Sequence, residues 1–315
     1  MSKRAYITVA TENYHYLALA LGRSINLFSK YPLHVFCINY LPAEENKGYG
    51  CFFHKIDYEI WETDWAVDYN ESGNYYVNRS NPRSFQIMTR KYEACLKILD
   101  YDYDECCFID CDSIAMPNID SIFGYASEIK NVPLFSLGPH NFMMVTDGVN
   151  IVRGDPFEGT WPIADIKKTL EWPLMQFLQV GEEKRGIYRT CNLFIFNKKC
   201  RKFIEDAEAF LDSLWRVVDV FYYAPFQDET VMNVLLWKTD AYGLPMVYIN
   251  LEGFHTLEHF CETEVQNDEL FGMFYRLPAE KNLVKVLHGE KRPEEIEKIT
   301  DFLIKLKEKK YFSHD

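Results

Sequence analysis

Apolar and polar positions along this 315-residue chain follow patterns typical of alternating strands and helices. Short apolar runs that predict buried strands occupy residues 6–10, 33–38, 106–109, 133–137, 193–196 and 284–288. Apolar residues recur at helical spacing over 17–28, 85–99, 203–215, 228–237 and 296–306. The first strand, helix and second strand predict a right-handed crossover within a parallel sheet. We therefore expect an α/β fold.

Two long segments lack these patterns. Residues 40–82 and 138–189 are polar, aromatic and interrupted by glycine, apart from an apolar pair at Phe52 and Phe53 that indicates one more short strand. Long irregular segments in compact folds are often lids or binding loops. We expect binding loops in both segments.

Two carboxylates, Asp110 and Asp112, directly follow the apolar run 106–109. In an extended backbone alternate side chains point to the same side, so both acids would face one hard cation beyond the end of the strand. The same spacing is common in turns and helix caps that bind no metal. The apolar approach, and the turn and short helix predicted at 117–123, favour the metal site.

A second informative stretch lies near the far end of the chain. The run 284–288 ends at His288, Gly289 lets the backbone approach a ligand closely, and the cations Lys291 and Arg292 follow. Two carboxylates and an imidazole suit Mn²⁺ or Mg²⁺ bridging a diphosphate, and the nitrogen ligand favours Mn²⁺. The ion and Lys291 would neutralise charge on a departing nucleoside diphosphate. A histidine satisfied within the core is the competing interpretation of His288.

Charged residues at two other predicted helices also have two interpretations. Arg90 and Lys91 suit either a solvated helix face or a contact with a phosphate or a donor substrate. Asp228 and Glu229 open a helix that then turns apolar, where each acid would stabilise the helix N-terminus by about 0.3–1 kcal/mol. The alternative for this pair is a functional role.

Composition narrows the class of function. A net charge of −13 opposes binding to nucleic acid or anionic membranes, so we expect neither as a partner. No run of about eighteen apolar residues occurs, and the opening residues do not resemble a secretion signal. We expect a cytoplasmic protein with no transmembrane segment. The nine cysteines are odd in number and lack a CxxC pair, which predicts reduced core residues.

Four stretches together resemble one known group of enzymes. The sequence is similar to the nucleotide-sugar glycosyltransferases of the GT-A fold, most closely to the retaining family 8, which includes glycogenin and bacterial galactosyltransferases. The resemblance depends on ITVATENY at 7–14 leading into 21–25, FIDCD at 108–112 continuing through 119–123, DETVMN at 228–233 and VLHGEKRP at 286–293. Glutamate stands at Glu229, where family 8 usually has glutamine, and an Asp-Glu pair is similar to the retaining family 6 enzymes.

The resemblance implies a role for each matching residue. It implies that the metal ligands are Asp110, Asp112 and His288, with Mn²⁺ or Mg²⁺ as the ion. It implies that the residues holding a UDP-sugar are Ala10, Thr11, Tyr14, Lys91, Asp110, Gly289 and Lys291. It implies that the catalytic residues beside the sugar are Asp228, Glu229 and Asn192, the last lying in the strand around 190–197.

The resemblance also implies a fold and an activity. The fold would be GT-A (Rossmann-like), a mixed and mostly parallel central sheet flanked by helices, in a single domain with a loop-rich acceptor region. Residues 1–293 would form this domain, with a nucleotide-sugar half at 1–125 and an acceptor half at 126–293, and a helix at 294–315 would pack on it. The activity would be transfer of a hexose from a UDP-sugar to a carbohydrate or glycosylated acceptor, with retention of configuration.

Two other functions stay open at this point. A sugar-nucleotide pyrophosphorylase also combines an α/β nucleotide fold with a divalent cation, but it would have a glycine-rich basic loop after the first strand, and residues 11–14 contain none. A carbohydrate-binding protein that kept the fold and lost activity is the second alternative. Metal-dependent binding of one nucleoside diphosphate would separate the enzymes from the binding protein.

Overall fold

The structure is a computed structural model that describes residues 2–44, 48–61, 82–116, 119–137, 144–146, 151–153, 171–186, 189–214, 216, 227–239, 248–250, 263–266, 269–272, 282–284, 286–289 and 291–312. Much of the two expected loop segments, 40–82 and 138–189, lies outside these residues. The backbones of His288 and Leu306 are described, whereas their side chains lie outside the description.

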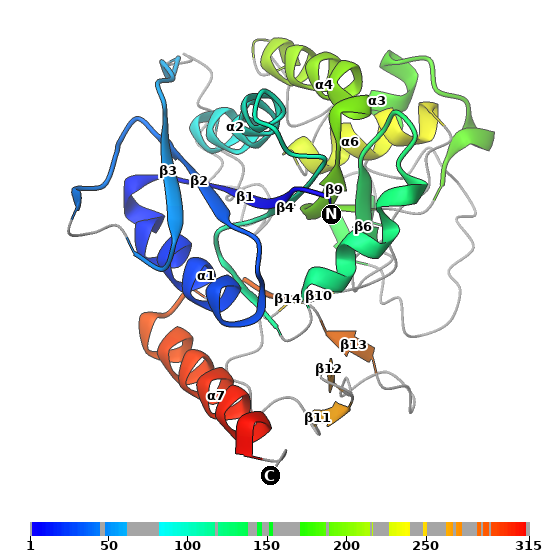
Figure 1. The fold of residues 1–315 in the computed structure, drawn as a ribbon. Coiled ribbons are helices and arrows are strands. Elements are labelled where there is room, and N and C mark those ends of the chain that lie inside the picture. Colours follow the sequence, from blue (N-terminus) through cyan, green and yellow to red (C-terminus); the bar gives the residue numbers. More distant parts are fainter. Residues whose placement is uncertain are drawn as a thin grey trace.

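A six-stranded sheet forms the centre of the molecule (Figure 1). Its order is β3-β2-β1-β4-β9-β6; β3, β2, β1 and β4 pair in parallel, and β9 runs antiparallel to both of its neighbours. This mixed, mostly parallel sheet confirms the expected architecture and is compatible with a Rossmann-like fold. Its strands are β1 (Arg4–Ala10), β2 (Leu33–Ile38), β3 (Cys51–Ile56), β4 (Glu105–Ile109), β6 (Leu134–Leu137) and β9 (Arg189–Phe196).

Helices cover both faces of the sheet (Figure 1). On one face α2, α4 and α6 pack against one another, and on the other face α1 packs against α7. The helices are α1 (His15–Phe28), α2 (Pro82–Ile98), α3 (Trp172–Phe177), α4 (Arg201–Leu214), α6 (Gln227–Lys238) and α7 (Pro293–Phe312). Short 3₁₀ helices are η1 (Glu12–Tyr14), η5 (Ile119–Glu128), η7 (Glu182–Lys184) and η8 (Lys198–Cys200).

Helix α1 shows how an apolar face fixes a helix beside the sheet. On α1, Leu17, Leu21 and Ile25 are spaced along one face and are almost completely buried. Burying an aliphatic side chain of this size contributes about 1.5–3 kcal/mol. These residues therefore hold α1 in place immediately after the end of β1.

Helix α2 departs from its predicted pattern. Met88, expected on the buried face, is 41% exposed, whereas Arg90 and Lys91 are buried. A solvated face is therefore the wrong interpretation of these two cations. Arg90 lies 4.0 Å over the ring of Tyr58 and pairs with Glu208 and Asp212, so it fastens α2 to α4.

Smaller sheets accompany the central one. The order β10-β14-β5 joins β10 (Tyr248–Asn250), β14 (Val286–His288) and β5 (Ser113–Ala115), while β11 (Thr263–Gln266), β12 (Glu269–Gly272) and β13 (Asn282–Val284) form another sheet. A two-stranded ribbon contains β7 (Met144–Thr146) and β8 (Ile151–Arg153). The predicted end of a strand at His288 is confirmed by β14, but the prediction of one strand over 284–288 is wrong, because Val284 belongs to β13 in a different sheet.

A second core cluster fixes the far end of the chain near the centre. Leu17 of α1, Ile114 of β5 and Ile299 of α7 pack together in it. The cluster holds α7 against α1 and brings the residues that precede α7 to the strand that follows β4.

The described part of the chain contains eight of the nine cysteines and several long helices. The cysteines that it contains lie outside any disulfide, and six of them are buried: Cys37, Cys95, Cys106, Cys107, Cys191 and Cys200. Their burial agrees with the prediction of core residues. Within the same part of the chain, no helix combines the length and the apolar character needed to cross a membrane.

A hydrogen-bonded row of rings crosses the outer strands β2 and β3. His34 Nε2 lies 2.8 Å from Tyr103 Oη, His34 Nδ1 lies 2.8 Å from His54 Nε2, and His54 Nδ1 lies 3.3 Å from Tyr101 Oη. The two imidazoles are stacked with their centroids 5.0 Å apart. Burial, with a smaller contribution from His54, lowers the pKa of His34 to about 4.

This shift predicts a loss of stability in acid that His34 causes. The unfolded chain takes up the proton near pH 6.5 and the folded chain only near pH 4, so the free energy of unfolding falls as the pH drops between these values, by up to about 3 kcal/mol. Chemical denaturation at pH 7 and pH 4.5 would measure it. His34→Gln should lose less stability over this interval than the wild type, and equal losses would contradict the prediction.

Candidate functional site

Three distant segments of backbone meet beyond the end of β4. Residues 110–112 connect β4 to β5, and the Asp110 amide donates to the Asn192 carbonyl at 2.9 Å. The Gly289 amide donates to the Asp112 carbonyl at 2.9 Å, and His288 lies opposite Ser113 in the antiparallel β14–β5 pair. The backbone of the C-terminal motif therefore lies directly beside the two acids.

The acids lie in a local geometry that differs from the prediction. Cys111 and Asp112 form a turn between β4 and β5, so the extended backbone expected through Asp112 is wrong. Asp110 and Asp112 are both partly buried, with 27% and 15% of their side chains exposed. Their carboxylates therefore remain accessible to a ligand although each already has a lysine nearby.

Lys91 connects two of the predicted site residues. Its Nζ lies 3.0 Å from Asp228 Oδ2 and 3.6 Å from Asp110 Oδ1, and it donates to the Cys191 carbonyl at 3.4 Å. Lys91 and Asp228 are 4% and 1% exposed. One ammonium from α2 therefore holds a carboxylate at the end of β4 and another at the start of α6.

The charge on Lys91 is stabilised by its surroundings. Burial acts to lower its pKa, but the nearby carboxylates of Asp110 and Asp228 act more strongly together, so the pKa lies above its ordinary value. Asp228 also accepts a hydrogen bond from Tyr92 Oη at 3.3 Å. A buried charge is tolerated when it is paired and hydrogen-bonded in this way.

Asn233 explains how the start of α6 is placed against β9. Its side-chain oxygen accepts from the Arg189 amide at 2.6 Å, and its side-chain nitrogen donates to the carbonyls of Arg189 and Glu229 at 2.7 and 2.8 Å. Glu229 Oε2 in turn accepts from the Cys191 amide at 3.4 Å. Asn233 thus positions Asp228 and Glu229, at the start of the same motif, next to the strand that carries Asn192.

The predicted sugar-side residues come together around β9. Asp228 and Glu229 each contact Cys191 or its hydrogen-bonded neighbour Lys91, and Asn192 follows in the strand. The Asn192 side-chain oxygen accepts from Thr190 Oγ1 at 2.6 Å. The helix N-terminal interpretation of Asp228 is thus incomplete, since its carboxylate also forms a buried ion pair.

Lys291 and two tyrosines surround the other acid. Lys291 Nζ lies 3.3 Å from Asp112 Oδ2 and 5.9 Å from the centroid of the Tyr14 ring. Tyr16 Oη donates to the Lys291 carbonyl at 2.8 Å. Tyr14 remains 42% exposed, so its ring is open to a ligand. Ala10 ends β1 and Thr11 follows it, and the Thr11 carbonyl accepts from the Tyr14 amide at 2.9 Å.

Two of the three predicted metal ligands, Asp110 and Asp112, have described side chains. Asp110 and Asp112 supply the hard oxygen atoms that Mn²⁺ and Mg²⁺ prefer. Within the described part of the chain, however, no group of three or more histidine, cysteine, aspartate or glutamate side chains is placed to hold a metal. The backbone of His288 lies beside these acids, but its side chain is outside the description. The two carboxylates are of the chemical type that suits a divalent cation, and the metal site itself stays a prediction.

Gly289 has a backbone conformation that predicts sensitivity to substitution. Its φ is +93°, a region that residues with a Cβ rarely adopt. Gly289→Ala should therefore lower the free energy of unfolding by about 1–3 kcal/mol and loosen the contact with Asp112. Chemical denaturation would measure the loss. Gly124→Ala is the control, because a Cβ there meets open space; a similar loss in both variants would contradict the explanation.

Sequence reasoning missed three residues that organise this site. Tyr92 and Asn233 fix Asp228 and the start of α6, and Tyr16 fixes the loop that carries Lys291. Asn233 is the last residue of the DETVMN motif, so its place in that motif was a signal in the sequence. Tyr92 and Tyr16 carry no local signal, since their partners are far away in the sequence.

Comparison with known proteins adds no relative. Neither the models of known protein families nor the curated protein sequences give a match to this chain.

Proposed function

We propose that the protein is a metal-dependent glycosyltransferase of the GT-A fold that transfers a hexose from a UDP-sugar to a carbohydrate or glycosylated acceptor, with retention of configuration. One observation carries the proposal: the Gly289 amide binds the Asp112 carbonyl, which joins the C-terminal motif to the acidic motif. Motifs that lie far apart in the sequence thus share one site with Lys91 and Asp228.

Each part of the site has a role in this proposal. Asp110, Asp112 and His288 would hold Mn²⁺ or Mg²⁺, which supplies positive charge for the diphosphate of the donor. Lys291 is partly exposed and carries a second positive charge beside Asp112, so it can bind the same diphosphate. Gly289 leaves room for close approach of the phosphates to the backbone.

The base and the sugar would lie on opposite sides of the acids. Ala10, Thr11 and the exposed ring of Tyr14 would bind uracil and ribose, since a flat aromatic face suits a base. Asp228 and Glu229 would orient sugar hydroxyls and stabilise positive charge developing on the ring, with Asn192 beside them. Lys91 would contact the donor while keeping Asp228 in place.

Retention does not require a dedicated base for the acceptor. A retaining enzyme attacks from the face of the leaving group, and a phosphate oxygen of the departing diphosphate can accept the proton of the acceptor hydroxyl. The chain's residues then need to hold the two substrates on one face and exclude water. Lys291 would stabilise the diphosphate as it leaves.

A calorimetric titration tests the proposal. UDP, GDP and CDP are titrated into the protein with and without Mn²⁺, and we expect UDP to bind with clear dependence on the metal. Slow hydrolysis of candidate UDP-sugars would then identify the donor. Absence of binding by all three diphosphates in the presence of Mn²⁺ would refute the proposal.

A further inference from the structure

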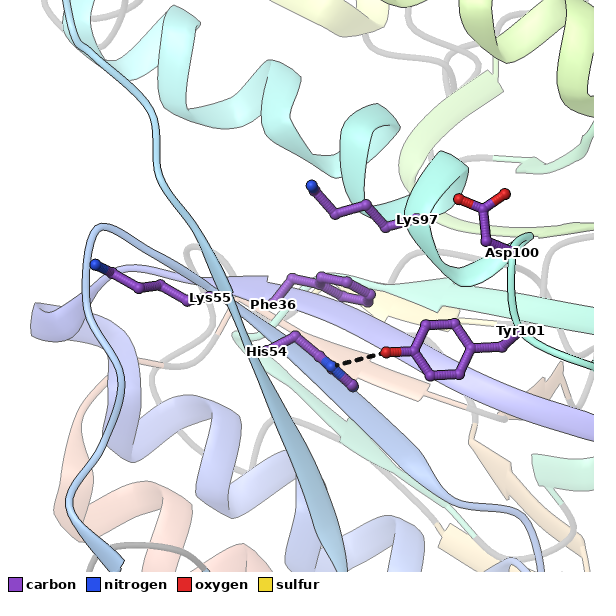
Figure 2. Close-up of a pocket in the computed structure, with 6 residues that line it drawn as sticks. All are labelled: Phe36, His54, Lys55, Lys97, Asp100 and Tyr101. Carbon is purple, nitrogen blue, oxygen red and sulfur yellow. Dashed lines mark hydrogen bonds between the residues drawn. The ribbon is translucent and has the colours of Figure 1, made fainter.

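A hollow lies between the end of α2 and the outer strands β2 and β3 (Figure 2). Its volume is about 350 Å³, within the range of small-molecule sites. Figure 2 shows Lys97 of α2, with Asp100 and Tyr101 just beyond the end of that helix, on one side, facing the strands that carry the other lining residues. The residues that line it are Phe36, His54, Lys55, Lys97, Asp100 and Tyr101, none of which belongs to the proposed transferase site.

The floor of the hollow is flat and aromatic. The His54 imidazole stacks on the buried Phe36 ring, with centroids 4.8 Å apart and an interplanar angle of 25°. The Tyr101 ring meets His54 edge-on at 5.6 Å and is itself partly exposed. Such a surface favours a ligand with a flat ring, because aromatic rings stack or meet edge-on with one another.

The rim of the hollow favours negative charge. Lys55 and Lys97 line it. Lys55 pairs with Asp57, just after β3, at 2.6 Å, and Lys97 pairs with Glu93, on the same helix, at 3.4 Å. Exposed pairs of this kind contribute little, so a bound anion could replace them. The one acid of the lining, Asp100, is already paired with Arg201 at 2.6 Å. The lining thus offers two exchangeable cations on a chain whose net charge is −13.

The row of rings behind the floor can accept one proton. In the neutral state each of its three hydrogen bonds needs one donor. One tyrosine hydroxyl and the single N–H group of each imidazole are these donors, and all three point the same way along the row. If one imidazole gains a proton, both its nitrogens donate and all three hydrogen bonds remain, with both tyrosine oxygens accepting. A second proton would leave two N–H groups facing each other between His34 and His54. The pair therefore has room for one added proton.

Within the described residues, the charged or titratable groups around this pair come from β2, β3, α2 and the connection that follows α2. His34 comes from β2, His54 and Lys55 from β3, Lys97 from α2, and Asp100, Tyr101 and Tyr103 from the connection between α2 and β4. Burial keeps the pKa of both imidazoles below its ordinary value, so the pair is neutral near pH 7. An anion in the hollow would favour the protonated pair.

We propose that this hollow binds a small anion that carries a flat ring, and that binding is coupled to the uptake of one proton by His34 and His54. The ring lies on His54 and Tyr101, and the anionic group lies between Lys55 and Lys97. If binding raises the pKa of the pair by about one unit, the affinity for the anion increases about tenfold once the pH is below the pKa of both the free and the bound protein.

Benzenesulfonate is a suitable probe because its charge does not change between pH 5 and 8. Its titration is followed through the ring signals of His34 and His54 in NMR spectra, with benzyl alcohol as the ring without charge and methanesulfonate as the charge without a ring. We expect the two histidine signals to move with benzenesulfonate and to move far less with either control. Unmoved signals, or equal responses to all three compounds, would overturn the proposal.

Two variants and a change of pH complete the test. Lys55→Gln combined with Lys97→Gln should weaken benzenesulfonate binding about tenfold or more, whereas Lys202→Gln, an exposed lysine of α4, should not. Wild-type affinity should increase between pH 7.5 and 5.5, and calorimetry in two buffers of different ionisation heat should show proton uptake. Unchanged affinity in the double variant would overturn the site, and binding without proton uptake would overturn the coupling.

Discussion

Replacement of Lys91 by methionine is expected to lower the free energy of unfolding by about 3–5 kcal/mol. The Lys91 ammonium lies 3.0 Å from Asp228 Oδ2 and 3.6 Å from Asp110 Oδ1 and is almost completely buried. Methionine retains most of the volume but removes the charge, which leaves a buried carboxylate at Asp228 without its cation. Urea denaturation at pH 7 would measure the change.

Two further variants separate this explanation from a general effect of losing a lysine. Lys202→Met removes an exposed partner of Asp206 and should cost no more than about 0.5 kcal/mol. Adding Asp228→Asn to Lys91→Met should recover part of the loss, because the uncompensated charge is then absent. A loss for Lys91→Met as small as for Lys202→Met would show that the buried pair contributes no such stability.

The central sheet was predictable because most of its strands, with the exception of the edge strand β3, are buried on both faces. Such strands are continuous apolar runs, and β2 has the bounds that the pattern predicts, 33–38. The parallel pairing of β1 with β2 followed from the helix between them. The local pattern of apolar residues was thus sufficient to predict these buried strands and the parallel pairing of β1 with β2.

The remaining errors concern structure that distant partners determine. The apolar run 284–288 divides between β13, which pairs with β12, and β14, which pairs with β5 and β10. Nothing within the run itself marks this division. The turn at Cys111 and Asp112 likewise depends on β14, the strand with which β5 pairs in antiparallel orientation.

The candidate site was predictable in its charged residues and not in their supports. Asp110, Asp112, Lys91 and Asp228 are polar residues that interrupt apolar patterns, so each is visible in the sequence. Tyr92 resembles any core aromatic residue until its hydroxyl is seen beside Asp228, 136 positions away. Sequence patterns identify groups that are costly to bury, whereas three-dimensional contacts identify the groups that make their burial possible.

Replacement of Asp112 by asparagine is expected to weaken Mn²⁺-dependent UDP binding about a hundredfold and to remove most turnover of the donor. Asparagine has nearly the same shape but lacks the negative charge that a divalent cation requires. A loss of about 3 kcal/mol in the interaction with the metal corresponds to this factor. Calorimetry with UDP in the presence and absence of Mn²⁺ measures the binding, and hydrolysis of the UDP-sugar measures the turnover.

The matched control is Asp102→Asn. Asp102 is also an aspartate paired with a lysine, Lys3, but its side chain is 83% exposed and it lies before β4 rather than after it. Its substitution should leave UDP binding, metal dependence and turnover unchanged. If Asp112→Asn behaves like Asp102→Asn, the carboxylate at 112 has no part in metal binding, and the contact between Asp112 and Gly289 serves only to join β5 to β14.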